Sequence, residues 1–189
     1  MHAHPFVLES IREDIFNDRI WPDFVRLSNP DSPYLRMEEL APEKTVEAEG
    51  MRITHVIVDH VVRPFGLGVE DGRSTVVFGG DSGPTSRLWE VARRSPNLEA
   101  VYLECTFPDS MSELAEVSAH LTPATFREEV GKLPKSTRVF AVHIKPRYRD
   151  EVVEELTALE LPNLVIGRSG EEYAFGEREP RAEARRVTG

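Results

Sequence analysis

The chain has 189 residues, 40% of them hydrophobic, and its 33 acidic residues outnumber 23 basic ones to give a net charge of -10. This size suits one globular domain with a sizeable core. The acidic balance argues against a surface that neutralises nucleic-acid phosphates over a wide area. A small anionic substrate would need a local cation, which a metal ion could supply.

The cysteine content and the N-terminal residues indicate a compartment. Cys105 is the only cysteine, which excludes a disulfide within the chain and fits a reducing environment. The first residues lack the basic start and apolar run of a secretory signal. No apolar run reaches the roughly 18 residues that a membrane-spanning helix needs. We therefore expect a cytoplasmic protein with no membrane partner.

The first half of the chain predicts a helix, a long connection and then short strands. Apolar residues between Phe6 and Phe16 recur at a near-helical spacing, and that pattern ends near Asn17. Four prolines predict an irregular connection over 18–42, and the pattern changes to strands after Lys44. Strands are predicted at 45–48, 52–62, 66–69 and 75–78, with Glu70-Asp71-Gly72 as a hairpin turn. These strands predict a short antiparallel meander.

After Asp81 the predicted helices and strands alternate. Helices are expected at 85–94, 111–119, 123–133 and 150–159, and strands at 100–104, 139–143 and 164–166. Such alternation implies parallel strands joined by crossover helices, and therefore an α/β fold. The last stretch, 177–189, is charged with almost no large apolar residue and predicts a disordered tail.

Three residues with metal-binding side chains follow predicted strands. His60, Asp81 and His143 each come just after an apolar run. Strand ends are where side chains from distant parts of an α/β sheet converge, and His and Asp are ligands for zinc, manganese or iron. Each residue alone has a simpler interpretation: the histidines could be structural, and Asp81 could cap the helix expected near Thr85. Their joint arrangement favours a metal site.

Five segments resemble, in order, those of metallo-β-lactamase-fold hydrolases. The metal-bridging aspartate of that fold is matched by Ser74-Thr-Val-Val-Phe-Gly-Gly-Asp81-Ser-Gly-Pro-Thr. Val58-Asp59-His60-Val-Val-Arg-Pro-Phe-Gly66 resembles the segment that places a histidine on the first metal. Ala141-Val-His143-Ile-Lys-Pro-Arg-Tyr148 resembles the segment that places a histidine on the second metal. Two more, Leu103-Glu104-Cys-Thr-Phe-Pro108 and His120-Leu-Thr-Pro123, are similar to those holding a Glu and a His near the reacting phosphate. The resemblance implies an α/β fold of the αββα sandwich type.

Within that superfamily, two segments look like the class II 3′,5′-cyclic-nucleotide phosphodiesterases. They are Ile15-Phe16-Asn17-Asp-Arg-Ile-Trp21-Pro22-Asp23-Phe24, whose aromatic residues should also pack at a helix end, and the His-Leu-Thr-Pro segment at His120. The transfer-RNA 3′-processing nucleases share the Glu and His features, but they carry a long insertion where this chain has a short hairpin between His60 and Asp81. A cyclic nucleotide is therefore the expected substrate, and an RNA-processing or other hydrolase on the same fold is the alternative.

The family's His-x-His-x-Asp-His motif is missing from the chain. Met1-His2-Ala-His4 has the first spacing without the Asp-His, and His55-Val-Ile57-Val-Asp59-His60 has Ile57 where a histidine is required. The resemblance thus implies that 1–176 is the C-terminal portion of such a domain, without its N-terminal strands. An uncovered apolar face would then favour a homo-oligomer. A third alternative is a truncated, non-catalytic module.

The resemblance also assigns roles. It implies two divalent ions in the complete enzyme, zinc or manganese with iron as a further alternative, held by His60, by Asp81 as the bridge and by His143. Because a zinc site in a hydrolase ordinarily has three or more protein ligands, we expect partial or no occupancy in this chain. His120 is the expected proton donor to the leaving 3′ oxygen, with Glu104 orienting it. Lys145 and Arg147 are the expected contacts to substrate phosphate, although solvated roles are an equal alternative.

Overall fold

The structure is a computed structural model, and it describes residues 1–62 and 64–176. The predicted disordered tail, 177–189, lies outside the described residues. Contacts divide the chain into two compact units, Met1–Lys44 and Thr45–Gly189. The boundary falls at Lys44, where the sequence pattern changes from irregular to strand-forming.

The first unit contains the predicted helix in two parts. Helix α1 spans Pro5–Ser10 and continues into a π-helical turn, Ile11–Ile15. Strand β1 (His2–Ala3) pairs in parallel with β2 (Glu38–Glu39). The helix expected over 6–16 is thus confirmed, with a wider last turn.

The aromatic residues of this unit pack only in part as predicted. The rings of Phe16 and Phe24 meet edge to face at 5.5 Å. Trp21, however, is 58% exposed, so the prediction that it packs with them is wrong.

The two N-terminal histidines have local partners: His2 Nδ1 lies 3.5 Å from Glu38, and His4 Nδ1 accepts the Phe6 N–H at the start of α1.

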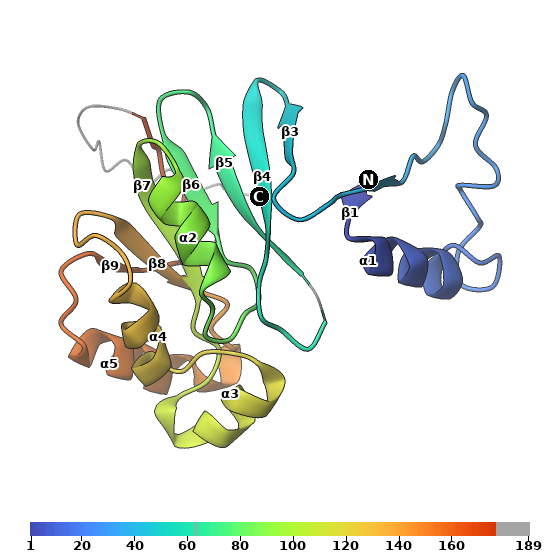
Figure 1. Ribbon diagram of the computed structural model, residues 1–189. Helices are drawn as coiled ribbons and strands as arrows, with labels where there is room; N and C mark the ends of the chain where they lie inside the picture. The colour runs from blue at the N-terminus through green and yellow to red at the C-terminus, as the bar shows by residue number, and fades with distance from the viewer. Residues whose placement is uncertain (63, 177–189) are drawn as a thin grey trace. The chain divides into compact units, whose positions relative to one another are not determined.

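The second unit is built on one seven-stranded sheet, whose strands follow in sequence order from β3 to β9 (Figure 1). The first four strands are antiparallel and the last four parallel, as the sequence predicts. Their bounds are β3 Thr45–Ala48, β4 Met51–Ile57, β5 Phe65–Glu70, β6 Thr75–Phe78, β7 Leu98–Glu104, β8 Arg138–Val142 and β9 Leu164–Ile166.

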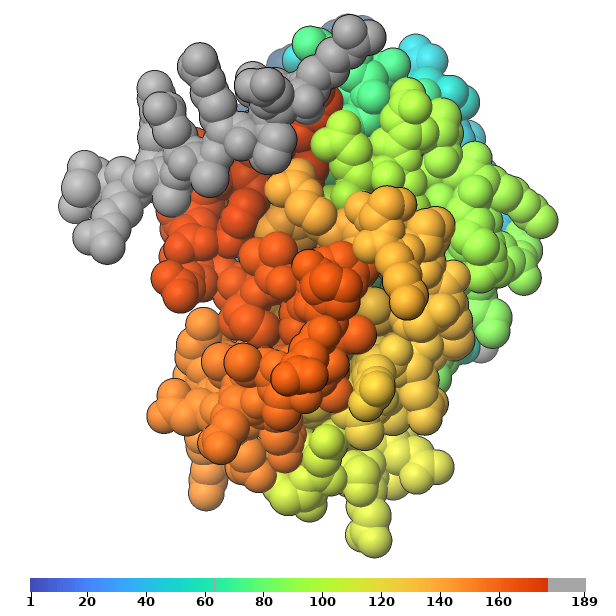
Figure 2. Space-filling model, turned by 90° about the vertical axis from the view of Figure 1, so that its left-hand side faces the viewer, coloured from blue at the N-terminus to red at the C-terminus, as the bar shows by residue number. Residues whose placement is uncertain are grey.

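Three helices cover one face of this sheet. They are α2 (Arg87–Arg94), α4 (Pro123–Val130) and α5 (Arg149–Ala158), and Figure 2 shows the surface that α5, in orange, forms with the residues around α4, in yellow to gold. Trp89 of α2, Phe126 of α4 and Leu156 of α5 are fully buried against Val101 and Val139 of the sheet. Burial of these apolar side chains is the main stabilising contribution to the unit.

The opposite face carries a row of aromatic rings. Phe78 stacks on Tyr102 at 4.9 Å between ring centroids, and Tyr102 stacks on Phe140 at 4.6 Å. Tyr173 and Phe175 meet Phe140 edge to face, at 4.6 and 6.1 Å. The described residues of this unit thus form one sheet and one helix layer of the expected sandwich.

The helices of the described residues are all short. None of them combines the length and the apolar character that crossing a bilayer requires.

Candidate functional site

The candidate residues gather at one edge of the sheet. Strands β4, β6, β7 and β8 run in the same direction, so their carboxyl ends lie at the same edge. His60, Asp81, Glu104 and His143 occupy or follow these four ends. Side chains at this edge of an α/β sheet face a common crevice. The convergence that the sequence suggests is present, and the chemical role of each residue stays a prediction.

Two glycines shape the loop that carries Asp81. Gly80 has φ of 66°, a left-handed conformation that favours glycine, and it turns the chain after β6. Gly83 donates its N–H to the Asp59 carbonyl at 2.8 Å, which ties this loop to the one carrying His60. A Cβ on Gly83 would lie 3.4 Å from the backbone of Ala119, the residue before His120. The loop does not cap α2, whose N-cap is Ser86, so the capping interpretation of Asp81 is wrong.

A helix ending places His120. Helix α3 (Ser112–Ser118) follows a 3-10 turn (Asp109–Met111) and ends at Ala119, which has φ of 53°. The His120 N–H then donates to the Ala115 carbonyl at 2.8 Å, the six-to-one bond of a Schellman ending. A left-handed alanine costs about 1 kcal/mol. The ending directs the His120 ring back to the end of β7.

The buried carboxylate of Glu104 has several hydrogen-bond partners. Its Oε1 accepts the Ser82 N–H at 2.8 Å and lies 2.6 Å from His120 Nδ1. Its Oε2 accepts the Leu121 N–H at 3.1 Å and the Thr106 hydroxyl at 2.6 Å. The side chain is fully buried, so these contacts replace water at every acceptor position. Glu104 therefore orients His120 and has no oxygen left over for another partner.

His143 lies at the end of β8 with a backbone strained for a residue that has a side chain. Its φ is 56°, and such outliers cluster at functional sites. Its Nδ1 lies 3.0 Å from the Thr106 hydroxyl and 3.4 Å from Asp81 Oδ1. His143 and Asp81 are each about half exposed, so the pair faces solvent.

His60 completes the cluster. Its ring centroid lies 4.9 Å from that of His120, and the His120 ring lies 5.6 Å from His143. His60 Nδ1 is 3.3 Å from the backbone of Val62, whereas its Nε2 is buried with no hydrogen-bond partner among residues 1–62 and 64–176. A buried nitrogen without a partner is costly unless something binds it. The interpretation of His60 as a satisfied structural histidine is therefore not supported.

The same groups include a set that could hold a metal ion. Ligand-type atoms of Glu104, His120 and His143 lie within 4.8 Å of one another. The Thr106 hydroxyl, however, contacts a polar atom of each of the three, at 2.6, 3.3 and 3.0 Å respectively. The Glu104 oxygens and Nδ1 of both His120 and His143 are therefore already engaged in hydrogen-bond contacts. By donor type, His60 Nε2, the exposed Asp81 carboxylate and the second ring nitrogen of His143 fit a metal.

The two expected phosphate contacts both lie on aromatic rings. Lys145 Nζ is 4.1 Å from the Phe107 centroid, and that ring is 5.7 Å from the His120 ring. The guanidinium of Arg147 lies 5.7 Å from the ring of Tyr148. A cation held over a ring face is stabilised there. Lys145 and His120 thus both contact the Phe107 ring.

Cys105 lies between Glu104 and Thr106 but is no nucleophile. The thiol is fully buried. Burial, together with the charge of Glu104, raises the pKa of the Cys105 thiol far above its usual range.

Sequence reasoning missed one residue of the cluster, Thr106. Its hydroxyl is fully buried and contacts Glu104, His120 and His143. One signal could have found it: in an extended segment the side chain two positions after Glu104 points to the same side.

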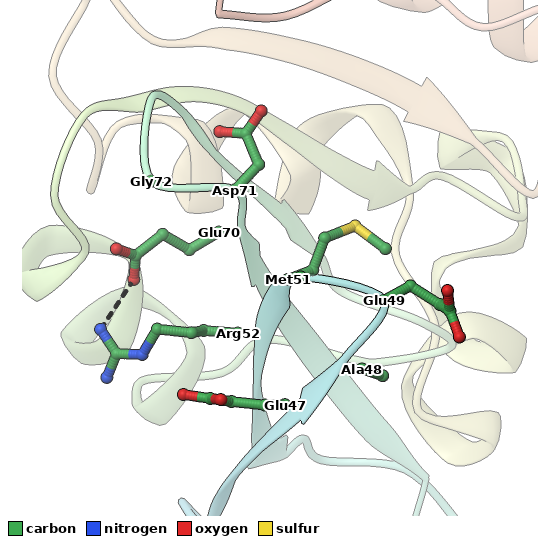
Figure 3. Close-up of a pocket in the computed structure, with 9 residues that line it drawn as sticks. Glu47, Ala48, Glu49, Met51, Arg52, Glu70, Asp71 and Gly72 are labelled. Carbon is green, nitrogen blue, oxygen red and sulfur yellow. Dashed lines mark hydrogen bonds and ion pairs between the residues drawn. The ribbon is translucent and has the colours of Figure 1, made fainter.

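A separate shallow pocket lies at the other edge of the sheet. Figure 3 shows it at the turns that join β3 to β4 and β5 to β6. Its charged residues are Glu47, Glu49, Glu70 and Asp71, with Arg52 paired to Glu70 at 3.4 Å. This pocket is distinct from the histidine cluster.

Comparisons with known structures identify the fold. The metallo-β-lactamase fold protein YhfI from Bacillus subtilis has a TM-score of 0.64 at 15% identity, covering 89% of this chain and 61% of that one. Zn²⁺-bound PqqB from Methylobacterium extorquens has a TM-score of 0.61 at 14% identity, covering 88% and 62%. A diphosphatase from the PhnP family has a TM-score of 0.59 at 16% identity, covering 88% and 55%.

These similarities show that the chain has the metallo-β-lactamase fold. At such identities they concern the fold alone, and the chain spans less than two thirds of the length of each of the three proteins. No protein-family model and no curated protein sequence matches the chain.

Proposed function

We propose that the histidine cluster is the site of a metal-dependent phosphodiesterase that hydrolyses 3′,5′-cyclic nucleotides. The observation that carries the proposal is the position of Asp81 Oδ1 and His143 Nδ1, 3.4 Å apart, in the cluster that also contains His60. Nε2 of His60 is buried, and no residue in the described part of the chain hydrogen-bonds to it. The structural similarity to a diphosphatase and to a Zn²⁺-bound protein supports phosphate chemistry with a metal.

His60, Asp81 and His143 are the residues that would hold divalent ions, which are zinc or manganese with iron as a further alternative. When bound, such ions lower the pKa of water toward neutrality and neutralise charge on phosphoryl oxygens. Hydrolytic zinc ordinarily has three or more protein ligands for each ion. With three such residues for two ions, we propose that the chain alone binds metal weakly.

His120 and Glu104 would act on the leaving group. His120 has Nδ1 committed to Glu104 at 2.6 Å, so its Nε2 is the atom available to hydrogen-bond or protonate the 3′ oxygen. Lys145, which lies over the Phe107 ring that His120 also contacts, would contact the substrate phosphate, and Arg147 would add charge.

The proposal is tested with the full chain incubated with Mn²⁺ or Zn²⁺ and cyclic AMP, cyclic GMP or a transfer-RNA precursor. We expect slow hydrolysis of a cyclic nucleotide, and only with added metal, because a chain that supplies three ligands for two ions should be a poor catalyst. Cleavage of the precursor alone would favour an RNA-processing nuclease, and no metal-dependent turnover of any of the three would contradict a hydrolase. Two tightly held ions per chain would overturn the prediction of weak binding.

The role of His120 has its own test. His120→Ala should lower kcat about 10²–10⁴-fold, the usual contribution of general acid catalysis, while bound metal stays unchanged. The control is His2→Ala, because His2 is half exposed in the first unit and should affect neither quantity. Unchanged turnover in His120→Ala would remove His120 from the mechanism.

A further inference from the structure

We propose that Thr106 is a positioning residue that sets which ring nitrogen of His143 carries the proton. By holding the proton on Nδ1, the hydroxyl leaves Nε2 of His143 as the atom with a free lone pair. The chemical use of that lone pair, metal binding, rests on the proposed function. The proton arrangement itself does not.

The argument begins with the single hydrogen of the Thr106 hydroxyl. Oγ1 lies 2.6 Å from Glu104 Oε2, 3.0 Å from His143 Nδ1 and 3.3 Å from both His120 Nδ1 and the His143 carbonyl. Glu104 has only acceptor oxygens as a carboxylate, and its contact is the shortest. The hydroxyl therefore donates to Glu104, and toward the two rings it can only accept.

The acceptor role of Thr106 fixes His143. A neutral imidazole carries one N–H, and its partner decides which nitrogen holds it. His143 Nδ1 faces the Thr106 oxygen at 3.0 Å and Asp81 Oδ1 at 3.4 Å, and both accept. The Nδ1–H form is therefore favoured. Because Thr106 is fully buried, no bulk water can replace its hydroxyl.

Glu104 influences the orientation of both His120 and His143, in the first case by direct contact and in the second through Thr106. It orients His120 directly, through the 2.6 Å contact to Nδ1. It orients His143 indirectly, because it takes the Thr106 hydrogen and so turns the Thr106 lone pairs toward His143. Removing the hydroxyl should therefore release His143 while leaving His120 held. This asymmetry distinguishes a positioning role from general loss of packing.

The test uses the full chain labelled with ¹⁵N-histidine, in Thr106→Val, Thr106→Ser and Thr85→Val variants. Valine matches the shape of threonine without its hydroxyl, and serine keeps the hydroxyl. Thr85→Val is the matched control because the Thr85 hydroxyl is buried and none of the residues described in the structure hydrogen-bonds to it. Two-bond ¹H–¹⁵N spectra at about pH 8.5, roughly two units above the ordinary imidazole pKa of about 6.5, identify the protonated nitrogen of each ring. His143→Gln assigns the signal.

We expect His143 in the Nδ1–H form in the unsubstituted chain, in Thr106→Ser and in Thr85→Val. Thr106→Val should give a mixture with the Nε2–H form at His143, while His120 keeps Nδ1–H. An Nε2–H form of His143 in the unsubstituted chain would overturn the proposal, whether or not Thr106→Val folds. So would an unchanged tautomer in a folded Thr106→Val variant, since Asp81 would then suffice.

A metal titration separates this inference from the proposed function. Loss of a group that orients a ligand usually costs 10–100-fold in metal affinity, so Mn²⁺ or Zn²⁺ binding should weaken by about that factor in Thr106→Val and recover in Thr106→Ser. If the unsubstituted chain binds neither ion, the proposed function fails, and the NMR result still decides the role of Thr106.

Discussion

Two kinds of buried polar side chain occur in the second unit. Glu104 is surrounded by four hydrogen-bonding groups, whereas the Thr85 hydroxyl and His60 Nε2 have none among the residues that the structure describes. An unpaired buried polar atom costs free energy of folding, so each one calls for an explanation such as a functional role. His60 lies within the histidine cluster, which gives its unpaired atom a functional explanation. Thr85 precedes α2 and has no comparable one.

Replacement of Thr85 by valine should therefore stabilise the chain. Thr85→Val removes an unpaired hydroxyl and keeps the side-chain shape, so we expect the free energy of unfolding to rise by about 1 kcal/mol. Urea unfolding followed by circular dichroism measures the change. Thr106→Val is the contrasting variant, and should lose about 1–3 kcal/mol because its hydroxyl has partners. A loss of stability in Thr85→Val would show that its hydroxyl has a partner.

At the scale of elements, a glycine in β5 allows α2 to pack closely against the sheet. Gly66 in β5 faces Leu88 of α2, and a Cβ there would lie 3.0 Å from Leu88 Cδ1 and 3.0 Å from the Phe78 carbonyl. Gly68, two positions on, has only Thr54 Cβ at 4.0 Å. The two glycines lie on the same face of β5 because strand side chains alternate. Their surroundings, and not their residue type, distinguish them.

A matched pair of substitutions tests this packing. Gly66→Ala should lower the free energy of unfolding by about 1–3 kcal/mol, because the methyl overpacks the contact with a backbone oxygen that cannot move aside. Gly68→Ala should change it by less than about 1 kcal/mol, and can raise it by restricting the unfolded chain. Chemical denaturation of both variants gives the comparison. Equal effects would mean that α2 and β5 are less tightly packed than described.

At the scale of the whole molecule, the second unit contains both the core and the site. The buried clusters on the two faces of the sheet lie between Val56 and Phe175. The candidate site residues lie between His60 and Arg147. Among the described residues, neither of these two clusters includes a residue of the first unit, Met1–Lys44.

A chain of residues 45–189 should therefore fold and keep the site. We expect a cooperative thermal transition, since the hydrophobic clusters are complete, and a metal affinity within about twofold of that of the full chain, since no candidate ligand is removed. Calorimetry and metal titration provide the measurements. A broad, non-cooperative transition would show that the first unit is part of the same folding unit.

The sequence predicted the elements of the sheet well where local signals are strong. The bounds of β3, β6 and β9 agree with the predicted strands because short apolar runs flanked by turn residues define them. The strand predicted over 52–62 was too long: β4 ends at Ile57, since the chain leaves the sheet to carry His60. Local apolar character cannot show where a strand loses its neighbour.

What the sequence by itself determined was the order of strands and helices, the antiparallel-then-parallel sheet and the strand-end positions of His60, Asp81, Glu104 and His143. Periodicity and connection length decide these properties, and both are local. Only the tertiary structure decided which side chains of the site hydrogen-bond to each other. Thr106 meets His143 because the ends of β7 and β8 are adjacent, and Glu104 accepts hydrogen bonds from Ser82 and Leu121 because three loops meet at one edge. Hydrogen bonds depend on distances of about 3 Å between residues far apart in sequence, and no local pattern encodes these.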